Sequence, residues 1–141
     1  EIMDAVHPGG LGGTYGGNPT ACAAGVGALG EIEAGHLIER AREIGAIFHE
    51  RLGALAAKYP QIGDIRGRGA MIGMELVDPA TGESNPGLTS ALAAYAHRNG
   101  VVMLTAGTYG NVIRFLPPLA ISDELLNEGL DVLAEAFAAS V

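Results

Sequence analysis

Two stretches of this sequence carry residue types suited to holding an anion, and the first is a glycine-rich loop. Six of the eleven residues from Gly9 to Pro19 are glycine, which disfavours helix and strand because glycine loses extra backbone entropy on ordering. Thr14 adds a hydroxyl, and Asn18 before the proline is typical of a helix start. Such a loop before a helix can hold a phosphate group. A flexible connecting loop is an equally good interpretation of the same residues.

The second stretch is an apolar segment that contains one arginine, Arg114. Val112, Ile113 and Phe115 surround it, so its guanidinium needs a partner if the segment is a strand. The planar fork of arginine fits a carboxylate with two parallel hydrogen bonds, which would suit an acidic substrate. The alternative is an internal salt bridge to one of the 16 acidic residues, with Glu75 as the candidate. The residues alone favour this salt bridge.

The other residues that could do chemistry show no catalytic pattern. The four histidines lack the spacing of metal ligands, and the single cysteine argues against a zinc site. Cys22 lies among alanines and glycines and is interpreted as a packing residue. Lys58, the only lysine, ends a charged helix, where nothing predicts the desolvation that a nucleophilic lysine needs. Arg66 and Arg68 flank a glycine and are expected in a solvated turn.

The composition bounds the class of protein. The chain has 141 residues and a net charge of −8, which argues against nucleic acid or an anionic membrane as a partner. No apolar run reaches the roughly 20 residues of a membrane span. One cysteine cannot form an internal disulfide, so a reducing, cytoplasmic location is expected. Because the first residue is Glu1, the sequence is interpreted as a fragment of a longer protein.

The order of the predicted elements indicates an α+β fold with helices packed on a small sheet. Helices are expected at residues 1–6, 19–32, 36–59, 88–99 and from 122 onward, and strands at 62–66, 70–77, 101–104 and 111–115. The small residues of 19–32 predict a helix buried against a neighbour. The clearest helix is 36–59, because its apolar residues recur at spacings of three and four. They are Leu37, Ala41, Ile44, Phe48, Leu52, Leu55 and Tyr59.

Three motifs in this order resemble class III (subgroup II) pyridoxal-phosphate-dependent aminotransferases. They are Gly-Gly-Thr-Tyr-Gly-Gly-Asn-Pro at 12–19, the segment 65–76, and 104–107 together with 111–119. The last is similar to the 4-aminobutyrate branch in particular, and the likeness covers essentially the whole chain. The resemblance implies the C-terminal small domain of a fold-type I transferase, with helices on a mainly antiparallel sheet. Residues 1–35 would then end the large cofactor-binding domain, and 36–141 would form the small domain.

The resemblance also implies roles for single residues. Gly13 and Thr14 match the residues that reach the phosphate of pyridoxal phosphate bound to the partner subunit of a homodimer. Arg114 matches the arginine that holds the carboxylate of the amino-acid or oxo-acid substrate, which reverses the preference for an internal salt bridge. The cofactor-binding lysine of the family would lie just before residue 1, and Lys58 does not match it. No catalytic residue is therefore expected in this chain, which alone should be inactive.

The activity that the resemblance implies is transfer of an amino group from 4-aminobutyrate, or a similar ω-amino acid, to 2-oxoglutarate. Another class III ω-aminotransferase is the alternative, acting on an ornithine derivative, β-alanine or 5-aminovalerate. Two interpretations from other classes stay open. One is a stand-alone module that binds a carboxylate through Arg114. The other is a structural oligomerisation domain, in which Arg114 would be tied into an ion pair within the chain.

Overall fold

The computed structural model describes residues 2–141, except for the side chain of Met3. The chain divides into two compact units, Glu1–Leu37 and Ile38–Val141. The first unit holds the glycine-rich loop and one helix, whereas the second holds the sheet and the hydrophobic core. The candidate anion-binding residues are therefore carried by two separate parts of the chain.

The first unit consists of a 3-10 turn, η1 (Met3–Ala5), the glycine-rich loop and the helix α1 (Pro19–Ala34). Asn18 caps α1, because its side-chain oxygen accepts a hydrogen bond from the Ala21 N–H at 3.1 Å. This cap and the proline at the first helical position confirm the predicted helix start. The helix expected over residues 1–6 is reduced to η1 among the described residues.

Helix α1 is exposed on all sides within this chain. None of its residues is buried, and Val26 and Leu29 are 72% and 68% exposed. Within the unit Glu1–Leu37 the predicted packing of α1 against a neighbouring element is not seen. Alanine and glycine permit a close approach, but they supply little of the apolar area whose burial drives packing.

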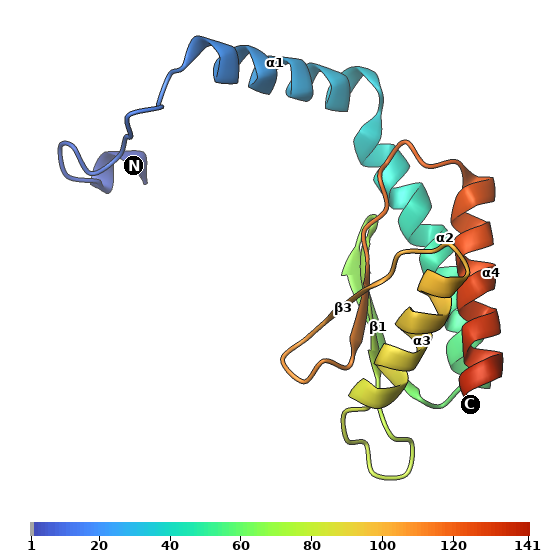
Figure 1. Cartoon of the computed structure of the whole chain (residues 1–141). Helices are drawn as coiled ribbons and strands as arrows, with labels where there is room; N and C mark the ends of the chain where they lie inside the picture. The colour runs from blue at the N-terminus through green and yellow to red at the C-terminus, as the bar shows by residue number, and fades with distance from the viewer. Residues whose placement is uncertain (1) are drawn as a thin grey trace. The chain divides into compact units, whose positions relative to one another are not determined.

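The second unit is α+β, as predicted. Residues 38–141, all of which the structure describes, form a four-stranded antiparallel sheet in the order β1-β2-β4-β3, together with the helices α2, α3 and α4. Figure 1 shows these helices on the same side of the sheet. In chain order the elements are α2 (Leu37–Lys58), β1 (Ile62–Arg68), β2 (Met71–Leu76), α3 (Pro86–Arg98), β3 (Leu104–Ala106), β4 (Val112–Phe115) and α4 (Asp123–Ser140).

The core lies between the helices and one face of the sheet, here called the inward face. Ile72, Met74 and Ile113 of the sheet are fully buried there, together with Phe137 of α4. In β2, buried and less buried residues alternate, which confirms the period-2 pattern predicted from the sequence. All seven apolar residues predicted for α2 are buried or half-buried. The cap of α4 is also as predicted, because the Ser122 hydroxyl accepts from the backbone N–H three residues on.

Two arginines of α2 join this helix to α4. The Arg40 guanidinium donates to the backbone carbonyl of Ile121 and to Asp123, both at 2.7 Å, and the hydrogen bond to the carboxylate raises the pKa of Arg40. Arg51 pairs with Asp131, two turns further along α4. Exposed ion pairs contribute about 0–1 kcal/mol each. The buried apolar contacts, rather than these pairs, therefore hold the helices in place.

The strand at the edge of the sheet differs from its prediction. The sequence predicts a strand at 101–104, whereas β3 covers Leu104–Ala106. The difference arises because residues 101–103, which come just before β3, form hydrogen bonds with the last turn of α3. The Val101 N–H donates to the Ala96 carbonyl at 2.9 Å, and the His97 ring nitrogen Nε2 lies 3.0 Å from the Met103 carbonyl. These groups are satisfied by α3 and do not join the sheet.

Candidate functional site

The glycine-rich loop has a backbone that only glycine adopts readily. Gly9, Gly12 and Gly17 have positive φ angles of 79°, 138° and 75°, in the region that side chains with a Cβ avoid. The Gly16 N–H donates to the Gly13 carbonyl at 2.9 Å and closes a tight turn around Thr14. The loop is therefore a shaped turn that leads into the first helix.

The groups at the tip of this turn have no partner among the described residues. The Thr14 side chain is exposed, and neither its hydroxyl nor the amides of Gly13 and Thr14 form a hydrogen bond with the part of the chain described. A Cβ on Gly13 would meet nothing within 4 Å, so a ligand has access to this backbone. Two amides and a hydroxyl next to open space are a donor set that fits a phosphate group.

Arg114 projects from the face of the sheet opposite the helices, here called the outward face. In the register of the sheet it pairs with Gly73 of β2 on one side and with Leu104 of β3 on the other. Its neighbours Ile113 and Phe115 are buried on the inward face, so alternation turns Arg114 outward. The apolar residues that flank Arg114 in the sequence do not enclose it, and its side chain is exposed.

The guanidinium of Arg114 is not paired with any described residue. It makes no hydrogen bond or ion pair with any residue that the structure describes. Glu75, its expected partner, is instead bonded to Arg66, with Arg66 Nη1 2.6 Å from Glu75 Oε2. The internal salt bridge that the residues alone favoured is therefore wrong, and so is the ion-paired arginine that an oligomerisation domain required. A planar fork with five donors is left open to a carboxylate.

Arg66 is the outward-face residue whose partners sequence reasoning missed. It lies inside β1, which extends beyond the predicted strand 62–66, and its Nη1 donates to Asp64 Oδ2 and to Glu75 Oε2, both at 2.6 Å. These bonds, first to Asp64 and then to Glu75, raise the pKa of Arg66. The signal that could have found it is alternation, because Asp64 and Arg66 are two residues apart and therefore share one face of a strand.

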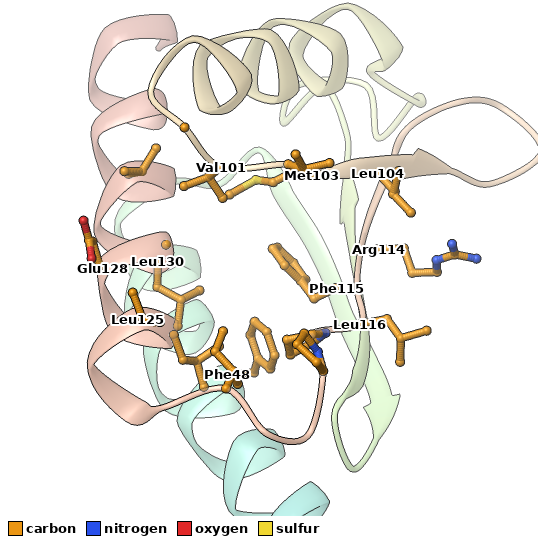
Figure 2. Close-up of a pocket in the computed structure, with 18 of the residues that line it drawn as sticks. Phe48, Val101, Met103, Leu104, Arg114, Phe115, Leu116, Leu125, Glu128 and Leu130 are labelled. Carbon is orange, nitrogen blue, oxygen red and sulfur yellow. The ribbon is translucent and has the colours of Figure 1, made fainter.

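A cavity of about 650 Å³ opens beside β4, between the segment 99–104, the segment 115–121 and α4. Its lining is largely apolar and includes Phe48, Phe115 and Leu130, with Arg114 at its margin. Figure 2 shows the Arg114 guanidinium pointing away from these three side chains. The cavity therefore offers apolar surface, whereas the charged end of Arg114 belongs to the open outward face.

The remaining candidates carry no chemistry that the structure reveals. The Lys58 ammonium lies 4.8 Å from the centroid of the Tyr59 ring, and Lys58 is exposed rather than desolvated. Cys22 is an exposed free thiol on α1, not a buried packing residue. Among the described residues no three His, Cys, Asp or Glu side chains gather as metal ligands. No helix in the described part of the chain is both long and apolar enough to cross a membrane.

Comparison with known proteins identifies the family. The family model described as "Aminotransferase class-III" matches residues 1–137. The 4-aminobutyrate aminotransferase of Mycobacterium bovis is 56% identical over 138 residues, which are 98% of this chain and 31% of that protein. The 5-aminovalerate aminotransferase of Pseudomonas putida is 43% identical over 138 residues, 98% of this chain and 32% of that protein. The chain thus spans about a third of the length of these curated relatives.

A solved structure gives the same answer at the level of the fold. The ornithine aminotransferase of Toxoplasma gondii, crystallised with partial occupancy of pyridoxal phosphate at its active site, matches 99% of this chain and 31% of its own length. The TM-score is 0.81 and the sequence identity is 34%. The resemblance drawn from the three motifs is confirmed: this chain belongs to the class-III aminotransferase family, whose members use pyridoxal phosphate.

Proposed function

We propose that this chain is a segment of an aminotransferase that moves an amino group from 4-aminobutyrate, or a similar ω-amino acid, to 2-oxoglutarate. The observation that carries the proposal is the unpaired guanidinium of Arg114 on an exposed strand face, in a chain that belongs to the class-III family. Relatives named for 4-aminobutyrate support the donor. A relative named for 5-aminovalerate supports the second candidate, another ω-amino acid of similar length.

The proposed role of Arg114 is to bind and orient the substrate carboxylate. A guanidinium with no partner in the described part of the chain can form two parallel charge-assisted hydrogen bonds to the two carboxylate oxygens. This fixes both the position and the rotation of the acid, so that its reacting end is held in one place. Because the fork lies on the side of the sheet away from the core, binding requires no rearrangement of the packed helices.

The proposed role of Gly13 and Thr14 is to hold the phosphate of pyridoxal phosphate. Their free amides and hydroxyl fit that group. When bound, the cofactor supplies the electron sink that transamination requires. We further propose a homodimer in which this loop contacts the cofactor of the partner subunit, with residues 1–35 ending the large domain and 36–141 forming the small one. A cytoplasmic location stays part of the proposal, supported by the single cysteine.

The chain contributes binding groups rather than the reacting base. Its only lysine, Lys58, is exposed beside Tyr59, whereas a nucleophilic lysine is activated in a desolvated pocket or next to another cation. We therefore expect residues 1–141 alone to show no aminotransferase activity, and tests of function use the complete protein that carries this sequence.

The Arg114→Leu variant tests the carboxylate site. Hydrogen bonds to a charged group are worth about 1.5–3 kcal/mol, so the KM for 2-oxoglutarate should rise by roughly 10- to 150-fold. Arg68→Leu is the matched control, because Arg68 is exposed at the end of β1 and its side chain forms no hydrogen bond or ion pair with the described residues. An equal rise in KM for the two variants would mean that Arg114 does not bind the substrate carboxylate.

The Thr14→Val variant tests the phosphate site. Valine keeps the shape of threonine but removes the hydroxyl donor, so purified protein should retain less pyridoxal phosphate, as measured by absorbance after release with alkali. The expected affinity loss is about 0.5–3 kcal/mol, the range of one hydrogen bond. A cofactor content equal to that of the unmodified protein, at a cofactor concentration near its dissociation constant, would count against the role.

A further inference from the structure

The carboxylate of Glu75, on the outward face, is held on both oxygens by neighbouring side chains. Arg66 Nη1 lies 2.6 Å from Glu75 Oε2, and the Asn111 side-chain amide donates to Glu75 Oε1 at 3.4 Å. Asn111 is itself fixed, since it is buried and also donates to the Leu76 carbonyl at 3.0 Å. Arg66 has a second anchor in Asp64 Oδ2, also at 2.6 Å. Glu75 is thus held from two sides, through Oε2 by Arg66 of β1 and through Oε1 by Asn111, the residue before β4.

The register puts Glu75 within reach of Arg114. Gly73 pairs with Arg114 and Glu75 pairs with Val112 across the same two strands, so Glu75 is the diagonal neighbour of Arg114. Diagonal neighbours in an antiparallel pair are about 7–8 Å apart, a span that long side chains bridge. Gly73 has no side chain to stand between them. Without its present partners, Glu75 would be a carboxylate able to occupy the guanidinium of Arg114.

We propose that Arg66 is a positioning residue: it holds Glu75 away from Arg114 and so keeps the Arg114 guanidinium open to a carboxylate ligand. This inference rests on the proposed function of Arg114. Three arginines and two carboxylates share this face, yet the structure pairs Arg66 with both carboxylates and leaves Arg114 with neither. The arrangement is what a binding site needs, because an internal partner would compete with every external acid.

The size of the effect follows from the strength of an exposed ion pair. An exposed ion pair of this strength corresponds to an equilibrium constant of about 1.4–5 for the paired over the unpaired state. If Glu75 paired with Arg114 in this way, only the unpaired fraction of Arg114 could bind a ligand, and the apparent affinity would fall in proportion to that fraction. Arg66→Met should therefore weaken carboxylate binding by about two- to sixfold. Arg66 does not touch the ligand in this account, so the loss should appear in Kd and KM and leave kcat nearly unchanged.

The test uses the complete protein loaded with its cofactor and glutarate, an unreactive dicarboxylate, as the probe in isothermal titration calorimetry. Arg66→Met should raise the Kd for glutarate by about two- to sixfold. Glu75→Gln alone should change the Kd by less than about twofold, because Arg66 stays paired with Asp64. The double substitution Arg66→Met/Glu75→Gln should return the Kd to the unmodified value, since the competing carboxylate is gone.

A matched double variant separates this mechanism from a general effect of charge. Arg66→Met/Asp64→Asn restores the same net charge, but Asp64 lies on β1, with β2 between it and Arg114. It should therefore leave the Kd as weak as in Arg66→Met. Equal rescue by both double variants, or no loss in Arg66→Met, would overturn the inference. Arg114→Leu distinguishes the failures: if glutarate binds that variant normally, the proposed function itself is wrong.

Discussion

Gly45, in the middle of α2, tests how closely this helix approaches the sheet. The residue is buried, and a Cβ built on it would lie 2.5 Å from the Gly69 carbonyl oxygen and 3.0 Å from the Gly69 carbonyl carbon. These are backbone atoms of the turn between β1 and β2, which cannot rotate away as a side chain would. A glycine in a helix interior normally costs about 1 kcal/mol relative to alanine. At this position the close approach of α2 to the Gly69 backbone leaves no room for a larger residue.

Alanine substitution at Gly45 should therefore destabilise the protein, although alanine is the better helix former. Inserting a methyl group into a filled space costs about 1–3 kcal/mol, against a helix-propensity gain of about 1 kcal/mol, so the net change runs from zero to a loss of about 2 kcal/mol. Gly53 is the matched control, because it lies in the same helix, is exposed, and offers open space to an added methyl group, with nothing within 4 Å. Gly53→Ala should stabilise by up to about 1 kcal/mol.

Urea unfolding followed by circular dichroism measures both variants under the same conditions. The midpoint should rise for Gly53→Ala and fall, or stay level, for Gly45→Ala, with equal slopes because neither change alters the surface exposed on unfolding. An equal gain in stability for the two variants would refute the reasoning. It would mean that α2 and the β1–β2 turn separate at no cost, and that the contact does not fix the position of the sheet.

Two further predictions concern α4. Phe137 is fully buried and its ring stacks on Tyr59, with centroids 4.8 Å apart, so Phe137→Ala should cost about 3–5 kcal/mol in urea unfolding, whereas Leu125→Ala, at an exposed position of the same helix, should cost far less. The pKa of Glu124 lies below its usual value, first through its own backbone N–H and then through the Ser122 hydroxyl. A carboxyl whose pKa is lower in the folded state stabilises the fold at a pH above its unfolded-state pKa, and this stability is lost as the pH falls through the folded-state pKa. Glu124→Gln should therefore lower the melting temperature at neutral pH and have no effect in acid.

The elements that depend on local sequence could be predicted, because their signals lie within a few residues of each other. The apolar spacing of α2, the caps at Asn18 and Ser122, and the alternation in β2 all agree with their predictions. The edge strand β3 is shifted from its predicted place, because its true limits depend on contacts of Val101 and Met103 with α3. Such contacts join residues whose spacing carries no periodic signal.

The candidate site divides in the same way. The open turn around Thr14 follows from its glycines, and the family follows from three local motifs. Whether the Arg114 guanidinium is paired could not be predicted in this way, because it depends on which strands are neighbours in the sheet. Glu75 was the right residue to suspect, because it is a diagonal neighbour of Arg114. The sequence could not reveal that β1 lies on the other side of β2 and places Arg66 beside Glu75.

The two faces of the sheet are shaped by different requirements. On the inward face, packing alone explains the choice of residues such as Ile72 and Met74, which are fully buried. On the outward face Gly73 sits in mid-strand, where glycine costs stability, although a Cβ there would meet Val112 at only 3.5 Å, an ordinary contact. Neither packing nor pairing accounts for Gly73 or for its neighbour Arg114. A bare backbone beside an unpaired guanidinium leaves room for an acid to approach, which is what the proposed carboxylate site requires of this row of the sheet.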